Sequence, residues 1–110
     1  MGDLIVIYKG DEEFEREFEL KNADGSPYDL TSHIARFKMV SDYGSTSTID
    51  QPAEIVTPET DGKVRYKFSS TDTSTVGRYY AEVETEEITT GKILTWKIAA
   101  VEIRPTVWGI

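Results

Sequence analysis

Short stretches in which apolar and polar residues alternate recur along this 110-residue chain, and they predict β-strands. The clearest is KVRYKF (63–68), where Val64, Tyr66 and Phe68 alternate with basic residues. Successive side chains of a strand point to opposite faces, so this stretch has one core face and one solvent face. No stretch carries convincing helical periodicity. The pattern therefore predicts an all-β chain.

Comparable strand patterns are separated by polar turns such as NADGSP (22–27) and TTGK (89–92), while residues 42–52 are expected to form a flexible loop. Short strands at this spacing predict an antiparallel β-sandwich of about seven to eight strands, which the family resemblance described below makes Ig-like. Residues 1–104 are expected to form this single domain. The further predicted strands lie within 4–8, 14–20, 29–40, 54–57, 79–84 and 93–104.

Two apolar runs depart from simple alternation. LIVIY (4–8) is continuously apolar, which is typical of a strand covered on both faces or of one that meets a neighbour. In the run 93–104, apolar residues up to Ile98 share one parity and those from Ala99 onward share the other. One inserted residue near Ile98–Ala99, or a break between two strands, would restore the pattern.

The segment TVGRYYAEVE (75–84) places two adjacent tyrosines after a glycine. Parity sends Tyr79 to the apolar face of the strand and Tyr80 to the outer face. Tyr79 follows Gly77 by two residues, after a polar crossover, which is the setting of a tyrosine corner. In such a corner the hydroxyl bonds back to the crossover backbone. Gly77 and Tyr79 are therefore predicted to have a structural role.

The charge balance excludes some classes of partner. Twelve basic and 20 acidic residues give a net charge of -8, which repels phosphate backbones and anionic membranes. No apolar run approaches the roughly 20 residues of a membrane span, and the N-terminus lacks the features of a signal peptide. The chain has no cysteine, so its core must form without disulfides. We predict neither nucleic acid nor membrane as a partner.

The sequence favours no enzyme and no cofactor. His33 is the only histidine, and a triad could be written with Ser32 or Asp29, but no nucleophile elbow or oxyanion loop accompanies it. The many carboxylates could contain a glycosidase pair, but glutamates on the outer face of a strand are usually solvated. No residue is predicted to be catalytic.

Two acidic turns could bind calcium, and the alternative is that they are ordinary solvated turns. Asp11, Glu12 and Glu13 form one cluster, and Glu59 and Asp61 another, and oxygen ligands from loops suit Ca²⁺. No spacing matches an EF-hand loop, so ordinary acidic turns are the preferred interpretation.

Outward aromatic side chains are the remaining functional candidates, since they stack on sugars or anchor protein interfaces. Residues 105–110 (PTVWGI) form an apolar tail that packs either on its own domain or on a neighbouring subunit. The predicted interface residues are Tyr43, Tyr80, Val107, Trp108 and Ile110.

Three segments together resemble the Ig-like N-terminal domain of bacteriophage baseplate upper proteins. The first, YKGDEEFEREFELKNADGSPYDLTSHIARFKM, carries a Gly-Asp pair before a strand, an Asp-Gly-x-Pro turn and an Asp-Leu-Thr before a Phe-centred strand. The second, DGKVRYKFSSTDTSTVGRYYAEVE, carries an Asp-Gly strand start and the Gly-x-Tyr corner, and GKILTWK follows.

The resemblance implies a non-enzymatic virion structural protein of the tail, the baseplate or the capsid surface. Such a protein acts through contacts with other virion proteins, as a homo-oligomer or within a larger assembly formed in the host bacterial cytoplasm. A carbohydrate-binding or adhesion module of the same fold is the alternative.

Overall fold

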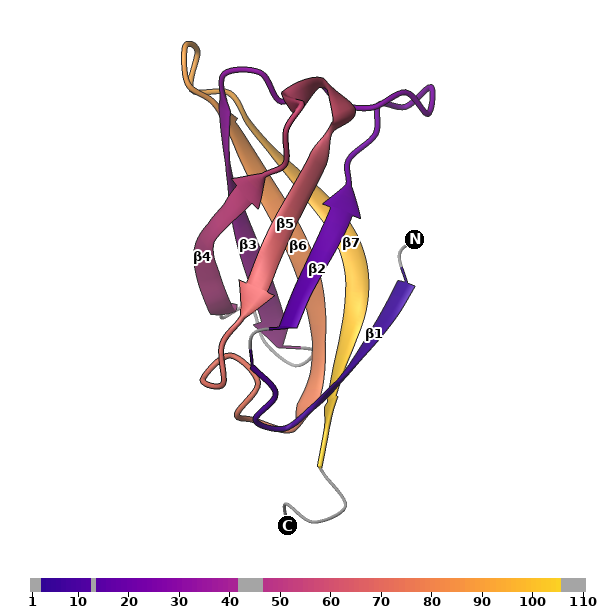
Figure 1. Cartoon of the computed structure of the whole chain (residues 1–110), viewed down its shortest axis with the longest axis vertical. Coiled ribbons are helices and arrows are strands. Elements are labelled where there is room, and N and C mark those ends of the chain that lie inside the picture. The colour runs from indigo at the N-terminus through magenta and orange to yellow at the C-terminus, as the bar shows by residue number, and fades with distance from the viewer. Residues whose placement is uncertain (1–2, 13, 42–46, 106–110) are drawn as a thin grey trace.

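The computed structural model describes residues 3–12, 14–41 and 47–105. Seven strands follow one another along the chain and form one curled sheet in the order β1-β7-β6-β3-β4-β5-β2 (Figure 1). The described residues contain one short 3-10 turn, Glu59–Asp61, and no helix long and apolar enough to cross a membrane. The strands are β1 (Asp3–Tyr8), β2 (Phe14–Glu19), β3 (His33–Ser41), β4 (Ser47–Ile55), β5 (Lys63–Phe68), β6 (Gly77–Glu87) and β7 (Ile93–Arg104).

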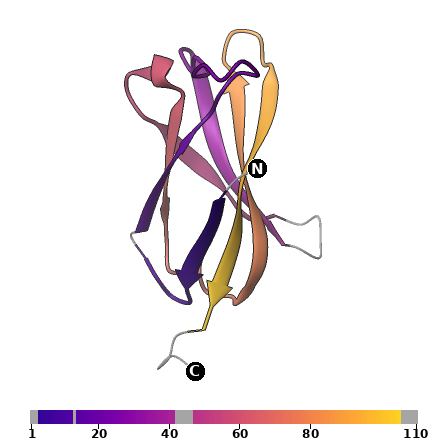
Figure 2. The same cartoon turned by 90° about the vertical axis from the view of Figure 1, so that its right-hand side faces the viewer.

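The sheet folds back on itself at β4, which pairs with β3 along most of its length and with β5 through its last two residues. This turn places β5 and β2 in front of β3, β6 and β7, so that the two layers enclose a core (Figures 1 and 2). All the pairings are antiparallel except β1 with β7, which is parallel. The predicted all-β, sandwich-like fold is confirmed.

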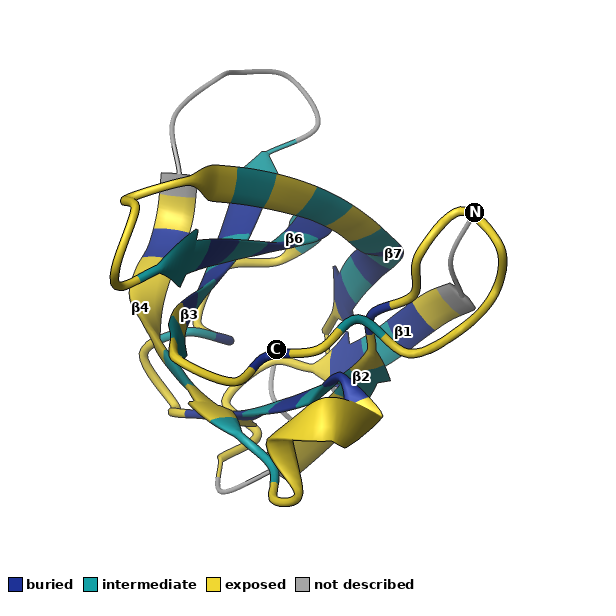
Figure 3. Cartoon of the chain, turned by 90° about the horizontal axis from the view of Figure 1, so that it is seen from above, coloured by how far each residue is buried: buried dark blue, intermediate teal, exposed yellow. Residues whose placement is uncertain are grey.

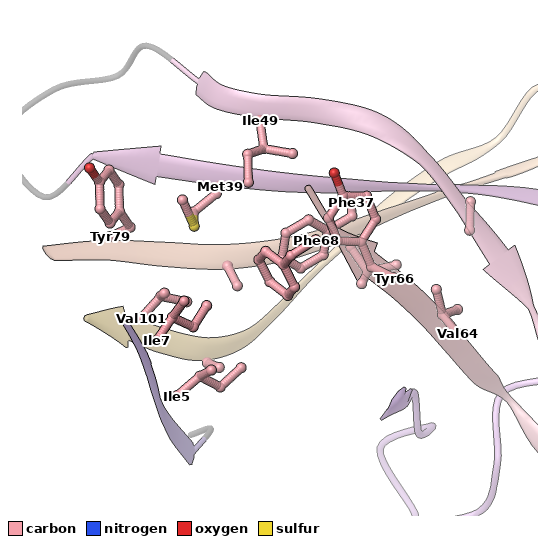
Figure 4. Packing of buried hydrophobic residues seen from close by; sticks show 14 of the residues in the cluster. Ile5, Ile7, Phe37, Met39, Ile49, Val64, Tyr66, Phe68, Tyr79 and Val101 are labelled. Atoms are coloured by element: carbon pink, nitrogen blue, oxygen red, sulfur yellow. The ribbon is translucent and has the colours of Figure 1, made fainter. Parts of the chain in front are cut away.

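Apolar side chains from both layers meet in the middle (Figure 4). The ring of Phe37 on β3 stacks on Tyr66 with 4.4 Å between centroids and meets Phe68 edge-on at 5.4 Å. Both partners come from β5 in the opposite layer. Aromatic pairs in these geometries add to the stabilisation from burial alone.

Strand parity follows the sequence pattern. The bands of buried and exposed residues alternate around the sheet (Figure 3). The inward positions predicted for β5, and Tyr79 in β6, are buried. In the β6–β7 pairing, Ala81 lies opposite Ala99 while Glu82 lies opposite Lys97, which leaves Ile98 as the inserted residue. The change of phase in β7 is therefore a β-bulge, as one of the two sequence interpretations proposed.

Two sequence predictions are corrected. The segment 47–55 is a strand, although the sequence suggested a loop over 42–52 and only a short strand at 54–57. Among its described side chains only Ile49 is buried, which explains why the segment is mostly polar. It forms a strand because it pairs with β3, and not because of its local propensity. The interpretation of LIVIY as a strand covered on both faces is also wrong, because β1 is an edge strand and Leu4 is 58% exposed.

Gly62 joins the turn after β4 to β5 at a point of close backbone approach. It adopts a φ of 69°, and its carbonyl accepts a hydrogen bond from the Leu20 N–H at 2.7 Å. A Cβ at this position would lie 2.7 Å from the Leu20 carbonyl oxygen and 2.8 Å from that of Tyr28. Only glycine fits this junction without a shift of the backbone.

Candidate protein interface

Tyr79 lies inside the sandwich at the start of β6, beside Met39 (Figure 4). Its hydroxyl donates a 2.7 Å hydrogen bond to the Thr75 carbonyl oxygen in the preceding crossover. Burial raises the pKa of this hydroxyl. A Cβ at Gly77 would lie 3.3 Å from the same hydroxyl oxygen, so the glycine leaves room for the ring. This is the geometry of a tyrosine corner.

Further hydrogen bonds tie the same crossover to the β1–β2 connection and to β5. Thr73 is fully buried, and its hydroxyl donates to the Asp11 carbonyl oxygen at 2.7 Å. The Tyr66 hydroxyl donates to the Asp72 carboxylate at 2.7 Å. Burial and this bond to an anion raise the pKa of Tyr66. These hydrogen bonds connect the crossover to the neighbouring elements of the sandwich.

Tyr80 points the other way, out of the sheet. The strand register places it beside Ala100 of β7, and Ala100 beside Leu4 of β1. On its other side Tyr80 lies opposite Val40 of β3. Tyr80 is 52% exposed and Leu4 58% exposed. We call Leu4, Ala100, Tyr80 and Val40 the outer row, because directly opposed residues on one face lie close enough for their side chains to touch.

Charged residues border the outer row on one side. In the next register position Glu102 lies between Val6 and Arg78. The Glu102 carboxylate pairs with the Arg104 guanidinium at 2.6 Å and with Arg78 Nε at 3.4 Å. Hydrogen bonding to Arg104, and more weakly to Arg78, lowers the pKa of Glu102. A shallow hollow of about 130 Å³ lies between this rim and the outer row. An apolar patch bordered by charged side chains is typical of a protein interface.

The sequence identified only part of this surface. It predicted Tyr80, but it missed Leu4 because an apolar run does not show which of its faces is left open. Tyr43, Val107, Trp108 and Ile110 lie outside the described residues. At the other end of the sheet, the sequence also missed three exposed residues, Ile34, Ile88 and Ile93.

Asp29 and His33, which could belong to a catalytic triad, form hydrogen bonds with other residues. The Asp29 carboxylate accepts hydrogen bonds from the N–H and hydroxyl of Thr31, which lower its pKa. His33 Nδ1 lies 2.8 Å from the Thr31 carbonyl oxygen, and its Nε2 lies 3.5 Å from the Tyr28 hydroxyl. The Asp29 carboxylate and His33 thus both bind Thr31, and the structure shows no triad hydrogen bond between them.

The described residues of the two acidic turns lie at the surface. Asp11 accepts a hydrogen bond from the Tyr8 N–H, and Glu59 and Asp61 lie exposed in the 3-10 turn. Glu13 lies outside the described residues. Within the described ranges, no three His, Asp or Glu side chains gather as metal ligands would.

The fold and this surface define a small all-β module with an exposed apolar row on its outer face. Residues 2–104 match the family of the BppU N-terminal domain. The chain therefore belongs to this family of phage baseplate upper protein N-terminal domains, as its sequence motifs suggested.

A solved structure shares the fold. The N-terminal domain of phage TP901-1 ORF48 superposes with a TM-score of 0.64 over 92% of this chain and 84% of that chain, at 11% sequence identity. None of the curated proteins compared with the chain matches it. Membership of the family supports a structural role in the phage virion.

Proposed function

We propose that this domain is a non-enzymatic baseplate module that attaches to other virion proteins through its outer row. The observation that carries the proposal is the alignment of Leu4, Ala100 and Tyr80 across three strands, with Leu4 and Tyr80 more than half exposed. Membership of the baseplate family supports the choice of virion proteins as partners.

The chemistry of the surface suits a protein partner. Tyr80 offers a large ring that buries apolar area while its hydroxyl keeps a polar contact, and tyrosine is enriched among the residues that dominate binding energy. The Glu102–Arg78–Arg104 group at the rim supplies charges that orient a partner more than they add affinity. The antiparallel pairing of β6 and β7 gives the row a rigid base.

The test is binding between the purified chain and the other baseplate proteins of the same phage. The double variant Leu4→Asp/Tyr80→Ala is expected to bind at least about tenfold more weakly, since it removes the two exposed apolar side chains at the centre of the contact. The matched control is Ile34→Asp, a 50% exposed residue at the far end of the same sheet, which should leave binding within about threefold.

Unchanged binding by the double variant would contradict the proposal. A glycan array distinguishes the carbohydrate-binding alternative. Glycan binding that is lost in Tyr80→Ala, combined with no binding to baseplate proteins, would favour that alternative.

A further inference from the structure

The strand β1 accompanies β7 along only half of its length. Asp3–Tyr8 pairs with Ala99–Arg104, so that β1 begins beside the middle of β7 and runs to the end of that strand (Figure 2). The other half of β7, from Ile93 to Ile98, pairs with β6 on one side, and no described strand pairs with it on the other. At the opposite edge of the sheet, β2 pairs only with β5. Besides the outer edge of β1, the described strands thus leave two open edges, the first half of β7 and the outer edge of β2.

Burial along β7 changes at the same point. The inward residues of the half beside β1 are buried, namely Ala99, Val101 and Ile103. In the half without β1, the inward residues Leu94, Trp96 and Ile98 are only half-buried. The half-buried residues of β7 therefore lie beyond the start of β1, where no described strand pairs with β7 on that side.

A groove of about 480 Å³ occupies this place, between Glu17–Lys21 and Thr95–Ile98. We call it the β2–β7 groove. Phe18 and Trp96 contribute half-buried aromatic rings to its lining, and Trp96 packs on Tyr28 with 5.0 Å between ring centroids. The rest of the exposed lining is mostly polar, from residues such as Glu17, Lys21 and Lys97. An open strand edge beside such a groove is a site at which an extended segment can add to a sheet.

We propose that the β2–β7 groove receives residues 106–110 (TVWGI) of a second copy of this chain as an added strand. Five extended residues span at most about 18 Å, which suffices to cover the roughly 13 Å of the four β7 residues in the groove. In a strand, Trp108 and Ile110 share one face, so both point toward Phe18 and Trp96. The segment brings no charged side chain to a rim that holds both acidic and basic ones.

The segment must come from another copy. It follows Pro105 at the end of β7 that lies away from the groove (Figure 1). The edge of β7 between that end and the groove is occupied by β1. The resulting contact joins two different surfaces of the same chain, and repetition of such a contact builds a ring or an open row of copies. This inference deepens the proposed role in a baseplate assembly and rests on it.

Disulfide trapping tests the contact in the full chain, since the chain has no cysteine of its own. Thr95 is exposed beside the groove, and Val107 of the added strand has the parity that places it on the same outer side. A mixture of Thr95→Cys and Val107→Cys chains is expected to form disulfide-linked pairs under mild oxidation. Thr60→Cys, exposed in the 3-10 turn, replaces Thr95→Cys in the matched control.

We expect at least about tenfold more cross-linked product with Thr95→Cys than with Thr60→Cys, because only the former approaches its partner closely enough. Adding Trp108→Ala to the Val107→Cys chain should reduce the product at least about fivefold while leaving the melting temperature unchanged. Equal products at positions 95 and 60 would overturn the proposal. Predominant Thr95→Cys homodimers would also overturn it, since they would indicate edge-to-edge pairing of two β7 strands.

Failure of this inference and failure of the proposed function are distinguishable. Chains carrying Leu4→Asp and Tyr80→Ala should still cross-link through the β2–β7 groove. Conversely, deletion of residues 106–110 should abolish self-association at high concentration, measured by sedimentation, while other baseplate proteins still bind the outer row. Equal loss of self-association and thermal stability on this deletion would show that the tail belongs to its own core.

Discussion

The two faces of β6 carry neighbouring tyrosines with opposite surroundings. Tyr79 is 7% exposed and donates its hydroxyl to the crossover backbone, whereas Tyr80 is 52% exposed beside Ala100. Residue type and strand are the same, so the difference comes from strand alternation alone. The inner face of the sheet thus contributes to the core, while the outer face carries the exposed row on which the proposed contact rests.

The largest expected difference between the faces concerns a buried charge. Val64→Asp places a carboxylate at a fully buried position and should abolish cooperative folding. Burying an unpaired charge costs several kcal/mol, comparable to the whole stability of such a domain, about 5–15 kcal/mol. Tyr80→Asp on the outer face should still unfold cooperatively. Circular dichroism during urea titration measures both, and a cooperatively folded Val64→Asp chain would invalidate the assignment of faces.

Two turn glycines differ in the same way: backbone atoms crowd Gly62, whereas the space around Gly91 is open. Gly62→Ala should cost about 3 kcal/mol or more of unfolding free energy, because the new Cβ meets the backbone of Leu20 and Tyr28 as well as an unfavourable φ. Gly91 has a similar φ of 75°, but nothing lies within 4 Å of its would-be Cβ. Gly91→Ala should therefore cost only about 1 kcal/mol. Equal shifts of the urea midpoint would show that φ alone matters.

The comparison is sharpest for the two tyrosine hydroxyls. Tyr79→Phe removes the bond to Thr75 and should cost about 1 kcal/mol. Tyr80→Phe changes an exposed side chain and should stay within about 0.5 kcal/mol of the parent. Chemical denaturation of the two variants in parallel measures both changes in unfolding free energy. A larger loss for Tyr80→Phe would reverse the roles of the two faces.

The smallest effect concerns the charged rim. Its ion pairs lower the folded-state pKa of Glu102, so their stabilisation is complete above the ordinary carboxylate pKa of 4.5 and is lost as the pH falls through the lower folded-state value. Glu102→Gln should therefore show a shallower decline of unfolding free energy between pH 5 and pH 2, measured at low salt. Salt should reduce the difference because the pair is exposed. Parallel pH profiles would indicate that the pairs contribute nothing.

The features that the sequence predicts are those that depend on the residue pattern of a single strand. The alternation of Val64, Tyr66 and Phe68 predicts their face, and the change of phase after Ile98 predicts either a bulge or a break, of which the structure has the bulge. The glycine two residues before Tyr79 signals the corner. In each case one strand's own pattern carries the information.

Features that depend on which strands lie together were not predictable in this way. β4 is a strand because β3 pairs with it, while its own composition is that of a loop. The outer row exists only because Leu4, Ala100 and Tyr80 share a register across β1, β7 and β6, and no local pattern contains that register. Leu4 is exposed because, like Tyr80, it lies on the outer face of the sheet, which no described element covers.

The parallel pairing of β1 with β7 has a mechanical consequence. Because the two strands run in the same direction, the beginning of β1 and the end of β7 lie at opposite ends of their shared ladder. A tensile force applied at these two points slides the strands along each other and loads the bonds between Asp3–Tyr8 and Ala99–Arg104 together. An antiparallel pair pulled from one end would open bond by bond. Tension applied between the start of β1 and the end of β7 would therefore act on this ladder in shear.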